Sequence, residues 1–248
     1  MIGQRPPTLK VYAAGSLRGP LTEIAASYAA ETGERPQLTF GASGLLRERI
    51  EKGETAHVFA SADTQHPRTL ASAMGDWNMP RVVVRNSLCA LVGPSVEVTT
   101  ETLLVRMLDP SVKLGTSTPG ADPSGDYAWE LFRKAERLHS GAYAVLDAKA
   151  LKLTGSAGTP APPAGRSTYA WNMDAGRADI FLTYCTNAFA ACCESPQLRV
   201  AEVPAALQVS AAYGVISRQG HEGAHRFERH LLSAQAQQVF LRFGFAAP

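Results

Sequence analysis

Four segments of this sequence place a small hydroxyl residue beside glycine or alanine where a helix is expected to begin. They are AAGS at 13–16, GAS at 41–43, ADPSGDYA at 121–128 and GRST at 165–168. A helix start presents backbone N–H groups without intrahelical partners and the positive end of the helix dipole. Small side chains let an anion approach that backbone, and a hydroxyl adds a donor. One such start is usually a simple cap, but four of them favour an anion site made of neutral donors.

Two kinds of enzyme are weighed against this hypothesis. HEGAH at 221–225 matches the H-E-x-x-H pattern of zinc proteases. However, Gly220 and Gly223 weaken a helix through it, and no third ligand is evident. The nucleophile elbow G-x-S-x-G of serine hydrolases is absent, and neither Ser43 nor Cys185 has an identifiable base in the sequence. A hydrolase or metalloenzyme therefore remains the alternative from another functional class.

Composition narrows the range of partners. The 248 residues are 45% hydrophobic and 19% charged, with a net charge of +2. A chain so close to neutrality gives no electrostatic case for nucleic acid or an anionic membrane, and no apolar run is long enough to span a bilayer. G-x-G-x-x-G and the P-loop are both missing, so a nucleotide site has little support. We expect no nucleic-acid partner.

The four cysteines are Cys89, Cys185, Cys192 and Cys193. No pair has C-x-x-C spacing, so neither a zinc ribbon nor a thioredoxin motif is indicated. A bridge from Cys185 to Cys192 or Cys193 is compatible with an oxidising compartment. The other interpretation, small buried thiols, stays open for each of the four.

The elements that must position the helix starts alternate between strand and helix, which predicts an α/β fold with a mostly parallel sheet. The first third predicts strands at 9–14, 36–40 and 57–62, and helices at 16–33, 43–53 and around 68–73. A longer strand at 81–94 enters a second unit. There the pattern predicts strands at 112–117, 143–148 and 178–184, helices at 127–138 and 167–176, and a loop at 153–165. Residues 223–245 form two helices with a break near Ser233.

Read in order, the segments resemble the periplasmic molybdate/tungstate-binding proteins that supply ABC importers. The similar segments are LKVYAAGSL, LTFGASGLLRERIEKGETAHVFASAD, RNSLCALVGP, ADIFLTYCTNA and AQQVFLRFGF. The resemblance implies a type II periplasmic-binding-protein fold with two hinged α/β lobes. Each lobe would be a mostly parallel five-stranded sheet flanked by helices, with the ligand in the interlobe cleft. The first lobe is expected at 1–84 and 205–248, and the second at 85–204.

The resemblance also implies a ligand set. Ser16 and Ser43 would donate through hydroxyl and backbone N–H, Ser124 through its backbone amide, and Tyr184 through its hydroxyl. The remaining amide falls within 166–168, where Ser167 is taken as the site residue, with Arg166 and Thr168 as additional candidates. Hydrogen bonds to a charged group contribute roughly 1.5–3 kcal/mol each, so about seven would offset the lost hydration of a dianion.

We therefore expect a non-enzymatic, monomeric binding protein without a cofactor or metal-cation site. It would carry molybdate or tungstate to the permease of an ABC importer. Asp122 and Asp126 depart from the family pattern and are expected to face outward or cap their helix. Arg166 and Arg18 add positive charge beside donor positions. These departures leave sulfate or a small carboxylate open as the ligand.

The expected location is the periplasm. The N-terminal sequence MIGQRPPTLK lacks the apolar region of a signal peptide. Because periplasmic capture requires export, we expect that a leader has been replaced by the initiator methionine.

Overall fold

The computed structural model describes residues 8–248, which divide into two compact units. Unit 1 comprises the chain up to Arg85 and again from Ala212, and unit 2 comprises Asn86–Ala211. The two divisions fall within long strands, β4 (Arg81–Val92) and β9 (Ser210–Ser217).

The second division lies later than the expected 204/205. Gln208 explains the difference, because its side chain accepts from the N–H of Leu88 and donates to the carbonyl of Leu88, both at 3.1 Å. Residues 205–211 are thereby held to unit 2, and the change of unit moves to 211/212.

Unit 1 alternates strands with helices as the hydrophobic pattern predicts. Its two terminal helices are separated just before Ser233, whose side chain caps the second helix. The predicted break is therefore confirmed. Its further elements are β1 (Lys10–Ala14), η1 (Gly15–Leu17), α1 (Arg18–Thr32), β2 (Gln37–Gly41), α2 (Ser43–Glu51), β3 (Val58–Ser61), α3 (Gln65–Met74), α9 (Glu222–Leu231) and α10 (Ala234–Arg242).

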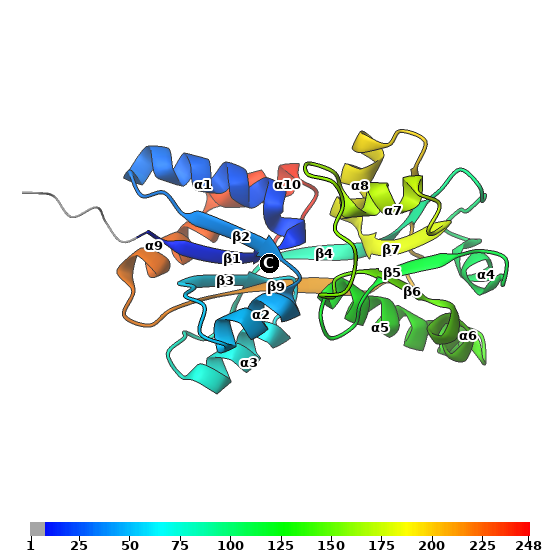
Figure 1. Ribbon diagram of the computed structural model, residues 1–248, viewed down its shortest axis with the longest axis horizontal. Coiled ribbons are helices and arrows are strands. Elements are labelled where there is room, and N and C mark those ends of the chain that lie inside the picture. Colours follow the sequence, from blue (N-terminus) through cyan, green and yellow to red (C-terminus); the bar gives the residue numbers. More distant parts are fainter. Residues whose placement is uncertain (1–7) are drawn as a thin grey trace, which may run out of the picture. The chain divides into compact units, whose positions relative to one another are not determined.

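The strands of unit 1 follow the order β2-β1-β3-β9. β1 pairs in parallel with β2 and with β3, whereas β9 pairs antiparallel to β3. α1 and α10 lie on one face of these strands and α2 and α3 on the other (Figure 1). A buried cluster that includes Tyr12, Leu46, Phe59 and Trp77 fills the space between strands and helices. The parallel strands therefore end at one common edge, where the helices begin.

Unit 2 is built in the same way. Its strands follow the order β8-β4-β7-β5-β6, with β5 parallel to β6 and β7, and β4 antiparallel to β7 and β8. Its elements besides β4 are α4 (Leu103–Leu108), β5 (Leu114–Ser117), α5 (Pro123–Leu138), α6 (Ala142–Lys149), β6 (Leu151–Thr154), α7 (Thr168–Asp174), β7 (Ile180–Tyr184), α8 (Cys185–Glu194) and β8 (Arg199–Glu202).

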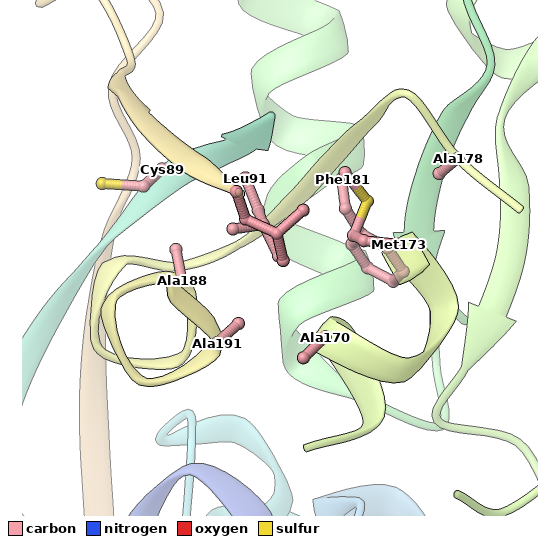
Figure 2. Close-up of a cluster of buried hydrophobic side chains, with 9 residues drawn as sticks. Cys89, Leu91, Ala170, Met173, Ala178, Phe181, Ala188 and Ala191 are labelled. Atoms are coloured by element: carbon pink, nitrogen blue, oxygen red, sulfur yellow. The ribbon is translucent and has the colours of Figure 1, made fainter. Parts of the chain in front are cut away.

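The core of unit 2 lies between its strands and the pair α7 and α8. Leu91 and Phe181 from the strands meet Ala170, Met173 and Ala188 from the helices (Figure 2). The small alanine side chains let the two helices approach the sheet closely. α5 and α6 cover the opposite face (Figure 1).

The predicted α/β fold is confirmed, with two local corrections. The segment 143–148, predicted as a strand, is helix α6, because Ala142 and Leu146 form a buried stripe at helical spacing against α5. The predicted loop at 153–165 begins later, since Leu151–Thr154 forms β6 and pairs with β5.

Candidate functional site

The hydroxyls of Ser16 and Ser43 follow neighbouring strand ends in unit 1. Ser16 lies in η1 directly after β1, and Ser43 is the first residue of α2 directly after β2. The parallel register pairs Ala14 with Gly41, so the two strands end side by side. The structure thus brings the two predicted unit 1 residues to one sheet edge.

Ser43 does not cap its helix, contrary to the expectation of a cap. Ala42 is the N-cap residue and no side-chain cap is formed. Instead the buried Ser43 hydroxyl accepts a hydrogen bond of 3.1 Å from the backbone N–H of Ala62, just after β3. A hydroxyl that accepts in this way keeps its own proton to donate. Ser43 is therefore oriented as a donor by the neighbouring strand.

Ser16 is half-buried, and its hydroxyl lies 2.9 Å from the hydroxyl of Tyr213 on β9. Tyr213 was not among the predicted residues, because the strand AAYGVIS carries no motif that distinguishes it from core. Its ring is buried and packs edge-on against Phe245. Tyr213 thereby positions the Ser16 hydroxyl from a third strand.

Two residues near these serines, Gly41 and Arg18, make packing contacts with neighbouring side chains. A Cβ at Gly41 would lie 3.3 Å from the side chain of Leu46, so the absence of a side chain at this position leaves room for the packing of Leu46. Arg18 lies with its guanidinium 4.6 Å from the centre of the Phe40 ring, a cation–π contact.

In unit 2, Ser124 is the second residue of α5 and is buried. Its backbone N–H, predicted to hold the anion, donates to the carboxylate of Asp122 at 3.1 Å. The expectation that the flanking acids face outward or cap the helix is confirmed: Asp122 is the N-cap of α5, whereas Asp126 is exposed and accepts from the N–H of Gly120 in the preceding loop. The amide of Ser124 is thus already bonded to a carboxylate of the protein.

A second carboxylate occupies the predicted donors before α7. Glu194 accepts from the N–H of Ser167 at 2.8 Å and from Arg166 Nε at 2.7 Å. Arg166 also reaches Asp174 at 2.6 Å, and these two acids raise the pKa of the guanidinium. Its charge is therefore compensated within unit 2. Thr168, the first residue of α7, stands where a helix leaves its N–H without an intrahelical acceptor.

Tyr184 ends β7 and is the N-cap residue of α8. Its buried ring contacts that of Tyr127 edge-on, with 6.2 Å between centroids. The next residue, Cys185, forms a disulfide with Cys89 of β4, a pairing that the sequence did not indicate. Cys192 and Cys193 are free. The disulfide fixes the position of the chain immediately after Tyr184.

Tyr169 is a further residue that sequence reasoning missed, although it follows directly on the GRST segment. Burial raises the pKa of its hydroxyl, with a further contribution from the Asp122 carboxylate. Hydrogen bonding with Thr183 and Asn187 acts in the opposite direction. The phenol therefore stays neutral beside the start of α5.

The two histidines of the HEGAH segment, compared above with a zinc-protease motif, form hydrogen bonds within unit 1. His221 caps α9 by accepting from Ala224 N–H at 3.0 Å, and His225 contacts Asn78 and Ser217. Within residues 8–248 no group of three or more His, Cys, Asp or Glu side chains is arranged to hold a metal ion.

The sequence as a whole matches one protein-family model. The model for bacterial extracellular solute-binding proteins matches residues 9–246. The chain belongs to this family. A relative in Pasteurella multocida, the uncharacterized protein PM1146, is 36% identical over 180 residues, which are 72% of this chain and 74% of the relative.

Solved structures of solute-binding proteins share the fold. The periplasmic molybdate-binding protein of Azotobacter vinelandii superposes with a TM-score of 0.76 at 18% identity, covering 97% of this chain and 99% of that one. The sulfate-binding protein SubI of Mycobacterium tuberculosis gives 0.76 at 15% identity, with 96% and 86% covered. PEB3 of Campylobacter jejuni with bound L-phospholactate gives 0.75 at 17% identity, with 97% and 100% covered. These likenesses support the fold of an extracellular solute-binding protein.

The disulfide bears on the location of the protein. Disulfides such as Cys89–Cys185 form and persist in oxidising compartments, which agrees with an extracellular family. Among residues 8–248, no helix combines the length and apolarity needed to cross a bilayer.

Proposed function

We propose that this chain captures a tetrahedral oxyanion in the periplasm and delivers it, without catalysing a reaction, to an ABC importer. The leading ligands are molybdate and tungstate. The observation that carries the proposal is the pair of hydroxyls after β1 and β2, with Ser43 accepting from Ala62 N–H and so keeping its own proton to donate. Neutral donors at strand ends suit an anion of fixed size, because they add no mobile counter-charge.

The proposal adds donors from unit 2 to the same anion. Tyr184 would supply its hydroxyl, and the amide of Thr168 replaces that of Ser167, which is bonded to Glu194. An anion that bonds both units favours the state in which they close on it. The molybdate-binding protein of Azotobacter vinelandii has the same fold and supports the choice of ligand.

The test is isothermal titration of the purified protein with molybdate, tungstate, sulfate and phosphate. We expect saturable binding of molybdate or tungstate at one site per chain, with a matching rise in melting temperature. No heat and no thermal shift with these two, alongside clear binding of another solute, would overturn the leading assignment.

A second candidate is a different anion held by the same fold, such as sulfate, a small carboxylate or a phosphate-bearing solute. Among these, Asp122 favours a phosphate-bearing or hydroxylated solute over sulfate, because its carboxylate bonds Ser124 N–H and can itself only accept a hydrogen bond, and sulfate has no proton to donate. The PEB3 structure with L-phospholactate and the sulfate-binding SubI show that this fold accommodates such ligands in other proteins.

The substitution Asp122→Asn separates a ligand that carries a proton or hydroxyl from a fully deprotonated one such as molybdate, tungstate or sulfate. Asparagine can still cap Ser124 through its side-chain oxygen but carries no charge. If the ligand is fully deprotonated, we expect its affinity to rise by up to about tenfold as a like charge is removed. A weaker affinity for phosphate with no gain for molybdate identifies the second candidate. Asp126→Asn, which alters a carboxylate bonded to Gly120, is the matched control.

A further inference from the structure

A cavity lies within unit 1, at the edge of the sheet opposite Ser16 and Ser43. It has a volume of about 340 Å³ and is lined by residues that include Glu54, His57, Arg218 and His221. His57 precedes β3 and Arg218 follows β9, which runs antiparallel to β3. The cavity therefore adjoins the strand starts and the N-cap of α9, His221, whereas the two serines follow the strand ends. α9 is labelled in Figure 1.

The hydrogen bonds of its two histidines fix their tautomers. His57 Nδ1 accepts from the N–H of Lys10, and His221 Nδ1 accepts from the N–H of Ala224, both at 3.0 Å. A neutral imidazole that accepts at Nδ1 carries its proton on Nε2. The rings are stacked, with centroids 4.2 Å apart and an angle of 27° between planes. The cavity thus has two N–H donors side by side.

Neither Nε2 has a protein acceptor within residues 8–248. The carboxylate in the wall, Glu54, bonds other groups: it receives Arg49 Nε at 2.9 Å, Arg49 Nη2 at 2.8 Å and the Tyr12 hydroxyl at 2.5 Å. The donors of this cavity therefore have no protein acceptor, whereas its carboxylate is engaged by Arg49 and Tyr12.

The cavity wall also holds Arg218, whose charge is paired with Asp76. Arg218 lies over the Trp77 ring at 4.5 Å, donates through Nε to the carbonyl of Ala56 and pairs through Nη1 with Asp76. Burial lowers the pKa of His57, and His221, Lys10 and Arg218 lower it further. Rings that carry their protons on Nε2 also offer no lone pair there to a metal cation.

We propose that this cavity binds the acidic group of a small solute, a carboxylate or a phosphate, through the Nε2–H donors of His57 and His221. The site is separate from the oxyanion site proposed above and does not depend on it. Each ring is held by a backbone N–H, so the donors are preorganised and lose little freedom on binding.

The experiment follows the imidazole ¹⁵N resonances of the labelled Ser43→Ala protein, which leaves the other site weakened. Acetate and inorganic phosphate are titrated separately to about 50 mM at pH about 7.5, which detects even millimolar affinity. We expect Nε2-protonated rings for His57 and His221 and a saturable shift of both with at least one of the two anions. The anion whose shift saturates at the lower concentration, and which therefore binds with the higher affinity, identifies the acidic group.

The variant His221→Asn tests the donor directly. Asparagine is a favoured N-cap, so the bond to Ala224 N–H can persist while the Nε2–H donor is lost. We expect affinity to fall by about tenfold. His139→Asn, an exposed histidine of unit 2, should leave it unchanged. Absence of a saturable shift with either anion, Nδ1-protonated rings, or unaltered affinity in His221→Asn would each overturn the proposal.

Discussion

At the scale of single residues, the candidate site depends on which donors are already engaged. Ser43 accepts from Ala62 and keeps a proton to donate, whereas the amides of Ser124 and Ser167 are bonded to Asp122 and Glu194. Two carboxylates of the protein thus stand where the anion was predicted to bind. An anion must displace them, or bind through the other donors.

Ser43→Ala is the sharpest substitution at this scale. A hydrogen bond to a charged ligand contributes about 1.5–3 kcal/mol, so affinity for the transported anion should fall about 10- to 150-fold. Titration calorimetry measures the change. The control is Ser27→Ala, whose hydroxyl bonds the carbonyl of Ile24 within α1. Equal affinities for the wild-type and Ser43→Ala proteins would remove Ser43 from the site.

At the scale of elements, short strands end where helices begin, and local bonds hold those junctions. Cys185 at the start of α8 is tied to Cys89 of β4, next to Tyr184. In unit 1, at the edge of the sheet where β1 and β3 begin, His57 accepts from the backbone N–H of the first residue of β1, and His221 caps α9. Each junction gives a testable contribution to stability.

Reduction of the disulfide should destabilise the protein by about 2–5 kcal/mol, because the bond closes a loop with a sequence separation of 96. Denaturant unfolding of the oxidised protein is compared with that of the reduced protein and of the Cys89→Ser, Cys185→Ser double variant. The free cysteines provide the control as Cys192→Ser and Cys193→Ser. Identical midpoints for the oxidised and double-variant proteins would contradict this contribution.

Acidification should weaken the junction at His57. Its pKa is lowered in the folded state, chiefly by burial and then by His221, Lys10 and Arg218. The unfolded chain then binds more protons, so stability is lost as the pH falls below the unfolded value of about 6.5. Melting temperatures between about pH 7.5 and 5 should fall more steeply for the wild-type protein than for His57→Gln. Parallel profiles would show that His57 does not contribute.

At the scale of the whole molecule, the chain passes from unit 1 to unit 2 within β4 and returns within β9. α9 and α10 therefore belong to the first unit despite lying at the end of the sequence. Two strand connections of this kind are compatible with hinge motion of the units.

A ligand bonded to both units should shift the population toward a more compact form. Small-angle X-ray scattering is expected to show a smaller radius of gyration at saturating molybdate or tungstate than without ligand. The Ser43→Ala protein at the same anion concentration is the control. An unchanged radius for the wild-type protein, despite full saturation by calorimetry, would argue against closure.

The sequence by itself determined the α/β alternation, the helix starts at Ser16 and Ser43 and the break at Ser233. These depend on local periodicity and on side chains within one helical turn. Segment 143–148 was misassigned because a short apolar run does not distinguish a strand from a buried helix.

Only the tertiary structure decided the partners of these residues. The Cys89–Cys185 bridge, the contact of Ser16 with Tyr213 and the bond of Glu194 to Ser167 join positions far apart in the chain. The paired His57 and His221 are likewise separated by most of the sequence. Such pairs arise when strands align in a sheet. Because alignment depends on the packing of the whole core, no local pattern encodes them.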